Sequence, residues 1–277
     1  MRHGERTGAD MAEPLRILSM GWGVQTWTLA SMIALGEMEP VDFMVFADTD
    51  HETEGTYAFS QQWTPWLRER GCEVVTVGGG RTDVVNYEGS SNSVMIPAFT
   101  VSPKGKLGQV RRQCTGDWKI APIRRFSSQQ LEERGQKKSP GAVVSIMGIS
   151  WDESMRMRDS DVAYIVNDYP LIDRRMTRAD CKIWLDAHDL PEPPKSACTF
   201  CPYHSKSAWQ EMKRQGGQDW KEAVAVDANI RDRRGEHGQL FVHSARLPLE
   251  EAVAIPEDVG AMQLTLDDAC EGGFCFV

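Results

Sequence analysis

The sequence of 277 residues lacks any run approaching the ~18 consecutive apolar residues that a helix needs to span a bilayer. Residues 1–13 carry five charged side chains and have no apolar core of the kind found in a signal peptide. The composition, 41% hydrophobic and 26% charged, excludes a disordered chain and a collagen-like chain. We therefore expect a cytoplasmic globular protein without a membrane partner, with residues 1–13 as a disordered leader.

Positive charge is also scarce. Lys and Arg number 31 against 40 Asp and Glu, and the resulting net charge of −9 makes the whole chain a poor general binder of nucleic acid. Residues 104–125 are the exception, with seven basic side chains, one acidic side chain and a local charge of +6. This segment either meets phosphates or forms a solvated basic face, and composition does not separate the two.

Apolar runs alternate with patterns of helical period along the chain. Strands joined by helices predict a parallel sheet with right-handed crossovers. The stretch 78–108 shows no clear period and is predicted to be a functional loop. Buried strands are predicted at 14–19, 41–47, 73–77 and 142–147, and helices at 25–35, 56–70, 120–134, 177–188, 206–214 and 221–234.

The first predicted strand and helix are joined by a glycine-containing loop, Ser19–Thr26. The N–H groups of a tight turn and the positive end of a helix suit an anion such as phosphate. A plain strand-to-helix turn is the alternative, because the loop matches neither common phosphate-binding glycine pattern. The candidate nucleotide-binding residues are Ser19, Gly21, Gly23, Gln25 and Thr26.

Asp48 and Thr49 close the second predicted strand. Ligands of open parallel sheets bind beyond the carboxyl ends of the strands. Asp48 is therefore predicted to contact a ribose or base, to hold a metal, or to cap the following helix.

Seven cysteines in a reducing compartment favour metal binding or catalysis over disulfides. Cys198 and Cys201 form a C-x-x-C pair, Cys114 lies in the basic segment, and His204 follows Cys201. Three interpretations remain open. Cys114, Cys198 and Cys201 hold an iron–sulfur cluster with one iron open, or form a closed zinc site with His204, or Cys198 and Cys201 form a redox dithiol.

The other cysteines divide into two groups. Cys270 and Cys275 lie in a glycine-containing tail and are either catalytic thiols that visit the active site or ordinary exposed thiols. Cys72 and Cys181 are predicted to be small core residues.

Taken together, these residues resemble the PAPS reductase-like branch of the PP-loop ATP pyrophosphatases over residues 15–215. The loop from Ser19 resembles the start of S-G-G-x-D-S, and Asp48–Thr49 resembles the D-T pair. Residues 114–123 resemble C-C-x-x-R-K-V-x-P-L, with Gln113-Cys114 in place of the tandem cysteines. Residues 148–156 resemble G-I-R-x-x-x-S-x-x-R, and residues 170–184 resemble P-L-x-D-W-x-x-x-D-V-W. The acidic residue of the loop and the C-terminal E-C-G-L-H motif are absent.

This resemblance implies a doubly wound, Rossmann-like α/β fold of the adenine nucleotide alpha hydrolase type. Residues 14–190 would form the nucleotide-binding domain, 191–255 a cysteine loop and helical part, and 256–277 a flexible acidic tail. It implies nucleotide contacts from Thr49, Gly148 and Glu153, catalytic roles for Lys119 and Arg156, and metal ligation by Cys114, Cys198 and Cys201. Several members hold a [4Fe-4S] cluster by three cysteines, and its open iron can bind a hydrosulfide.

We therefore expect an ATP- and Mg²⁺-dependent sulfurtransferase that adenylates a substrate oxygen and replaces it with sulfur. The acceptor is expected to be tRNA or DNA held by residues 104–125, or a small molecule. A sulfur donor such as a cysteine desulfurase and a homodimeric state are also expected. The alternatives are a PAPS- or APS-type reductase that releases sulfite with a thiol donor, and a nucleotide-binding module with a structural zinc.

Overall fold

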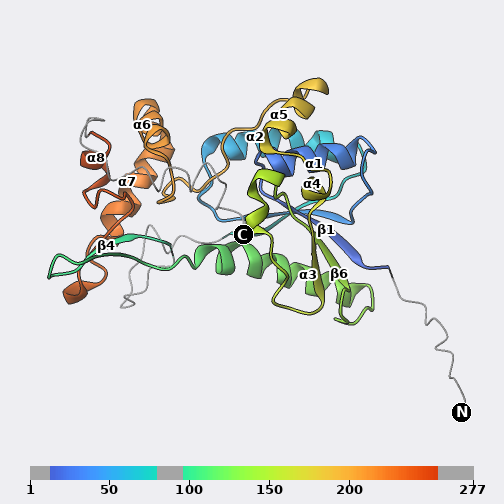
Figure 1. Ribbon diagram of the computed structural model, residues 1–277, viewed down its shortest axis with the longest axis horizontal. Coiled ribbons are helices and arrows are strands. Elements are labelled where there is room, and N and C mark those ends of the chain that lie inside the picture. The colour runs from blue at the N-terminus through green and yellow to red at the C-terminus, as the bar shows by residue number, and fades with distance from the viewer. Residues whose placement is uncertain (1–12, 80–95, 255–277) are drawn as a thin grey trace, which may run out of the picture.

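The computed structural model describes residues 13–79 and 96–254 of the chain (Figure 1). The predicted leader at 1–13 lies almost wholly outside these ranges, and the predicted tail at 256–277 lies entirely outside them. No helix within the described ranges is both long and apolar enough to cross a membrane.

A five-stranded parallel sheet forms the larger part of the protein, with the strand order β3-β2-β1-β6-β7. The chain runs outward from β1 to β3 and then returns to the other side of β1 as β6. The order therefore reverses beside β1, which is where open α/β sheets bind their ligands. The strands are β1 (Leu15–Met20), β2 (Phe43–Asp48), β3 (Val74–Gly78), β6 (Val143–Ile146) and β7 (Ile165–Asp168).

Helices cover both faces of this sheet, as Figure 1 shows. One face packs against α1 (Val24–Ala34), α2 (Glu54–Arg68) and α5 (Arg178–Ala187), and the other against α3 (Ala121–Glu133). This arrangement confirms the predicted doubly wound α/β fold. The helix predicted at 177–188 begins with a capping box, in which the Thr177 and Asp180 side chains each accept from the backbone N–H of the other residue.

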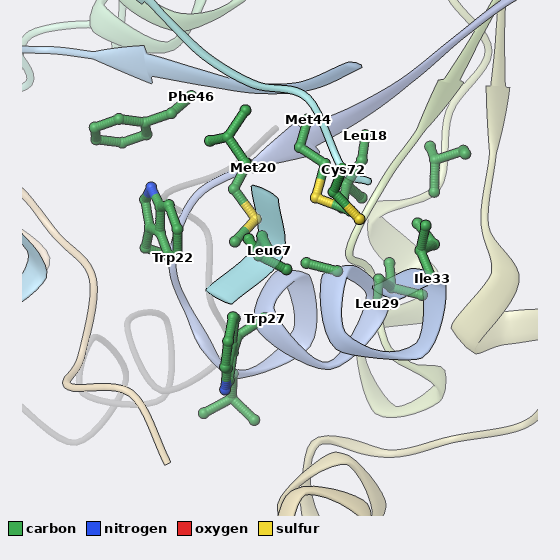
Figure 2. Packing of buried hydrophobic residues seen from close by; sticks show 14 of the residues in the cluster. Leu18, Met20, Trp22, Trp27, Leu29, Ile33, Met44, Phe46, Leu67 and Cys72 are labelled. Atoms are coloured by element: carbon green, nitrogen blue, oxygen red, sulfur yellow. The ribbon is translucent and has the colours of Figure 1, made fainter. Parts of the chain in front are cut away.

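The core follows from the two-residue period of the strands. Leu18 of β1 packs in the cluster under α1 and α2, whereas Ile17 packs in the cluster against α3. Figure 2 shows Leu18 and Met44 beside Leu29 and Ile33 of α1. Every residue of α1 from Val24 to Ile33 is buried, so this helix is the central element of the core.

A smaller antiparallel sheet, ordered β5-β4-β8, forms the second part of the protein. Its core includes residues of α6 (Lys206–Gln215), α7 (Gln218–Ile230) and α8 (Leu249–Ala252). Buried Asp227 accepts hydrogen bonds from the amides of Val242 and Leu249 and pairs with Arg231. The three strands are β4 (Phe99–Val101), β5 (Leu107–Gln109) and β8 (Gln239–Phe241).

The prediction of a functional loop at 78–108 was wrong where β4 and most of β5 lie, and residues 80–95 of that stretch lie outside the described residues. Strands of three residues are too short to show a period, and β4 pairs with a segment far along the chain. Strand β4, assigned to the first domain from the sequence, thus pairs with β8 of the second. Four short elements complete the fold: η2 (Thr115–Ile120, a π-helical turn), η3 (Trp151–Arg156), α4 (Pro170–Asp173) and η4 (Gly235–His237).

Candidate active site

Four parallel strands direct their carboxyl ends into one cleft at the point where the strand order reverses. The opposite wall comes from η2 and the start of α3, which contribute Lys119 and Arg124 among others. Six nucleotide-binding candidates are brought together here: Ser19, Gly21, Gly23, Gln25, Thr26 and Gly148. The sequence had not indicated the contributions of Ser145, Asn167 and Arg158, which also line the cleft.

The loop between β1 and α1 holds its shape by internal contacts. The Thr26 hydroxyl accepts from the Gly21 N–H (3.3 Å) and donates to the Gly23 carbonyl (3.2 Å). Trp22 is buried and has a positive φ of 56°, a conformation that non-glycine residues rarely adopt. Gly23 is the N-cap of α1 and offers no side chain to the first-turn N–H groups. Those donors are therefore available to a ligand anion.

Two glycines in the cleft have different reasons to be glycine. A Cβ on Gly148 would lie 2.6 Å from Thr26 Cγ2 and 3.1 Å from the Thr26 amide nitrogen, so the fold itself requires glycine there. A Cβ on Gly23 would meet only Ser196 Cβ at 3.9 Å, and its φ of −89° suits any residue. The absence of a side chain at Gly23 is therefore not explained by packing, whereas close approach of a ligand would explain it.

We expect Gly23→Ala to weaken adenine-nucleotide binding at least about tenfold, because a methyl group would stand where a phosphate approaches the amides of α1. Loss of the N-cap glycine should cost at most about 1 kcal/mol of unfolding free energy. Calorimetric titration with ADP and thermal denaturation measure the two effects. Gly217→Ala is the matched control, because Gly217 caps α7 without a side-chain bond. Equal nucleotide affinity in both variants would contradict a phosphate site at Gly23.

The end of β2 places its two candidates away from the cleft. Asp48 Oδ1 accepts from the Tyr57 hydroxyl (2.7 Å) and from the Asp50 amide (2.8 Å). It lines a separate pocket between β2, β3 and α2, and it does not cap α2, whose N-cap is Thr53. Thr49 is fully buried, and its hydroxyl lies 3.4 Å from Cys198 Sγ.

Cys114, Cys198 and Cys201 line one small, partly buried cavity together with Thr49, Arg112 and Lys119. Cys114 precedes η2, whereas the other two lie in the loop before α6. Burial, followed by the nearby Glu52 carboxylate, raises the pKa of the Cys198 thiol, and Lys119 opposes this rise. The thiol therefore stays protonated unless a cation joins the site.

The loop that carries Cys198 and Cys201 is fixed to the segment after β2. The Thr199 amide donates to the His51 carbonyl (2.8 Å), and the Thr53 amide donates to the Ala197 carbonyl (3.2 Å). Glu222 of α7 accepts from the Thr199 hydroxyl (2.8 Å) and contacts His51 Nδ1 (2.6 Å). The two thiols are thus held against the carboxyl end of the parallel sheet.

Neither the zinc nor the iron–sulfur interpretation gains support from the geometry. Within residues 13–79 and 96–254, no group of three or more His, Cys, Asp or Glu side chains is arranged to hold a single metal ion. His204 Nε2 instead contacts the Cys198 carbonyl oxygen (2.9 Å).

Lys119 connects the two cavities. It lines both the cleft and the thiol cavity, and its Nζ lies 3.0 Å from Glu52 Oε1. The Glu52 side chain is fully buried, and this ammonium group is its ion-pair partner. Glu52 was not among the predicted site residues, although its position so close to the end of a buried strand could have indicated it.

Glu153 and Arg156 form an ion pair of 2.7 Å between two buried side chains. Burial raises the pKa of Glu153, and the Arg156 charge partly opposes this effect. Neither residue lines the cleft. Arg156 instead lines a neighbouring pocket next to Thr115.

The remaining cysteines behave in two ways. Cys72 and Cys181 are buried in the main core, as predicted, and burial raises the pKa of the Cys181 thiol to about 12. Cys270 and Cys275, the predicted catalytic thiols, lie outside the described residues.

The basic segment 104–125 does not form one continuous face. It runs through the β4–β5 hairpin, η2 and the start of α3. Lys119 pairs with Glu52, and Arg124 pairs with Asp161. Its charge is thus divided among several surfaces.

No protein-family model matches the sequence, and no curated protein shows significant similarity to it. Among solved structures, the chain is similar to phosphoadenylyl-sulfate (PAPS) reductase from Candida auris in its phosphate complex. The two are 14% identical, the alignment covers 66% of this chain and 76% of that chain, and the TM-score is 0.39. The class that the fold defines is a doubly wound α/β protein with a ligand cleft at its switch point.

Proposed function

We propose that this protein is an adenine-nucleotide-dependent sulfurtransferase of the PAPS reductase-like branch of the PP-loop enzymes. One observation carries the proposal. Thr115 and Lys119 line both the cleft at the strand ends and the cavity of three thiols. A nucleotide-activated substrate in the cleft and a sulfur-binding centre at the thiols would therefore share a wall.

The reaction would proceed in two displacements. A substrate oxygen attacks the α-phosphorus of ATP and expels pyrophosphate, and a sulfur nucleophile then displaces AMP, which keeps that oxygen. The N–H groups around Gly21 and Gly23 would hold the phosphates, and Mg²⁺ would offset their charge. Lys119 would balance negative charge developing on the side of the thiol cavity.

We propose Cys114, Cys198 and Cys201 as the ligands of an iron–sulfur cluster, since all three line one cavity. Three thiols from two segments line one cavity, and the cations Arg112 and Lys119 line it as well. Cysteine thiolates are the usual protein ligands of such clusters. A bound [4Fe-4S] cluster would supply one iron without a cysteine ligand, at which sulfide can be held.

We expect protein purified without oxygen to absorb near ~400 nm and to contain about four irons per chain. Cys114→Ala should lose both the iron and the sulfur-transfer product, because two cysteines leave too few ligands for the cluster. Iron and sulfide assays on the same sample measure the first loss. Cys181→Ala is the matched control, since Cys181 is a buried thiol of the main core. If Cys114→Ala keeps its iron and its product, the proposal is overturned.

The proposed acceptor is a nucleic acid, with a cysteine desulfurase or similar enzyme as sulfur donor and a homodimer as the working state. No contact within residues 13–79 and 96–254 favours the reductase or the zinc module over sulfur transfer. The reductase would release sulfite from an adenylylated sulfate, so the product of the same assay separates the two enzymes.

A further inference from the structure

A second pocket borders the nucleotide cleft beside η2. Three arginines reach it from separate places: Arg112 before η2, Arg156 at the end of η3, and Arg158 in the segment that follows. Thr115, Gly116, Ile120 and Met155 complete its lining, which contains no carboxylate. The pocket shares Thr115, Ile120 and Arg158 with the cleft.

The charges in this pocket are only partly balanced. Arg156 forms an ion pair with the buried Glu153 carboxylate. In the parts of the chain that the structure describes, neither Arg112 nor Arg158 has an ion-pair partner. The Arg112 guanidinium carbon lies 5.7 Å from the centre of the Tyr203 ring, so the side chain has an aromatic contact instead of an ion pair within the described residues. A pocket lined by three arginines, of which two have no carboxylate partner among the described residues, suits a phosphate-like oxyanion.

Two residues that line the same pocket, Thr115 and Gly116, carry neutral hydrogen-bond donors. The Thr115 hydroxyl oxygen is buried in a residue that is 7% exposed, and it has no hydrogen-bond partner in the described residues. A buried hydroxyl without a partner costs free energy unless a ligand or water completes it. Thr115 and Gly116 also begin a helical run that continues through α3, and the first N–H groups of such a run lack partners within the helix.

We propose that this pocket is an oxyanion subsite that binds a phosphate group of the sulfur acceptor. The inference rests on the proposed function, because it assigns the second substrate of the same site. Thr115 lines the cleft, the thiol cavity and this pocket. A phosphate held by the arginines would therefore place the neighbouring atoms of the acceptor where the other two cavities meet. Met155, 82% exposed, offers an apolar contact at the rim for a ring next to that phosphate.

The test uses the full chain with saturating ADP, so that the nucleotide cleft is filled. Titration with ribose 5-phosphate, followed by ³¹P NMR, measures the subsite alone. Arg112→Gln should weaken binding about tenfold or more, because a charge-assisted contact to the phosphate is lost. Arg111→Gln is the matched control, since Arg111 is the neighbouring exposed arginine and lies outside all three cavities. Equal affinities in the two variants, or no saturable binding to wild type, would overturn the inference.

A second titration identifies the source of the phosphate. A labelled single-stranded oligonucleotide is bound to the same variants over a range of salt concentrations. A larger loss of affinity in Arg112→Gln than in Arg111→Gln supports the subsite with a nucleic-acid acceptor. If Arg112→Gln weakens the binding of ribose 5-phosphate but not of the oligonucleotide, the result supports the subsite with a small phosphate ester as the acceptor. Binding of ADP is measured separately, so failure of the nucleotide site and failure of the subsite give different results.

Discussion

Replacing Lys119 with methionine is expected to lower the rate of the proposed sulfur transfer by about two to three orders of magnitude. Among the described residues, Lys119 is the one cationic side chain that lines both the cleft and the thiol cavity. Methionine keeps much of the side-chain volume and removes the charge. Single-turnover measurements of product, with nucleotide affinity measured alongside, separate loss of chemistry from loss of binding.

The same substitution has a second effect, which needs its own control. It leaves the buried Glu52 carboxylate without its ion-pair partner, a change that typically costs about 3–5 kcal/mol. The double variant Lys119→Met/Glu52→Gln removes both charges and should recover much of that stability. Activity should stay low in the double variant if Lys119 acts on the reaction. Recovery of activity together with stability would show that Lys119 serves only to neutralise Glu52.

Replacing Trp27 with alanine is expected to lower the free energy of unfolding by about 3–5 kcal/mol. Trp27 is fully buried, and its ring contacts those of Trp22, Phe59, Trp63 and Trp66 at centroid distances of 5.3–6.2 Å. Its Nε1 also donates to the Pro191 carbonyl (3.1 Å), which fixes the segment leading to the cysteine loop. Urea unfolding followed by circular dichroism measures the change.

Two further variants test the source of this loss of stability. Trp27→Phe keeps an aromatic ring but loses the hydrogen bond, and should fall between wild type and alanine. Trp151→Ala is the control, because Trp151 is 46% exposed and its loss should stay within about 0.5 kcal/mol. Similar losses for Trp27→Ala and Trp151→Ala would contradict the central role assigned to α1.

The elements of the parallel sheet could be predicted because their signals are local. Short apolar runs and glycine-ended helices place β1, α1, β2 and α2 within a few residues of the predicted bounds. The small sheet could not be predicted, since β4 and β8 are short strands whose pairing depends on contacts distant in sequence. Local sequence patterns therefore predicted the parallel sheet that forms the cleft, but not the small antiparallel sheet.

Strand geometry explains why some of the predicted site residues line the cleft and others do not. Phe46 and Ala47 line the cleft, whereas Asp48 and Thr49 lie elsewhere, one against Tyr57 and the other against Cys198. Successive side chains at the end of a strand point in different directions, and a motif alone does not reveal which one enters the cleft. Arg158 carries no motif at all, and only the fold brings it beside Arg112.

The pairing of β4 with β8 has a consequence for synthesis of the chain. About 130 residues separate β5 from β8, and a ribosome takes on the order of ten seconds to add them. Until then the β4 edge that β8 will cover stays open. The thiol cavity also forms only late in synthesis, because Cys114 is made long before Cys198 and Cys201. A nascent chain shorter than about 200 residues cannot assemble it, so any metal must be loaded after most of the protein has been made.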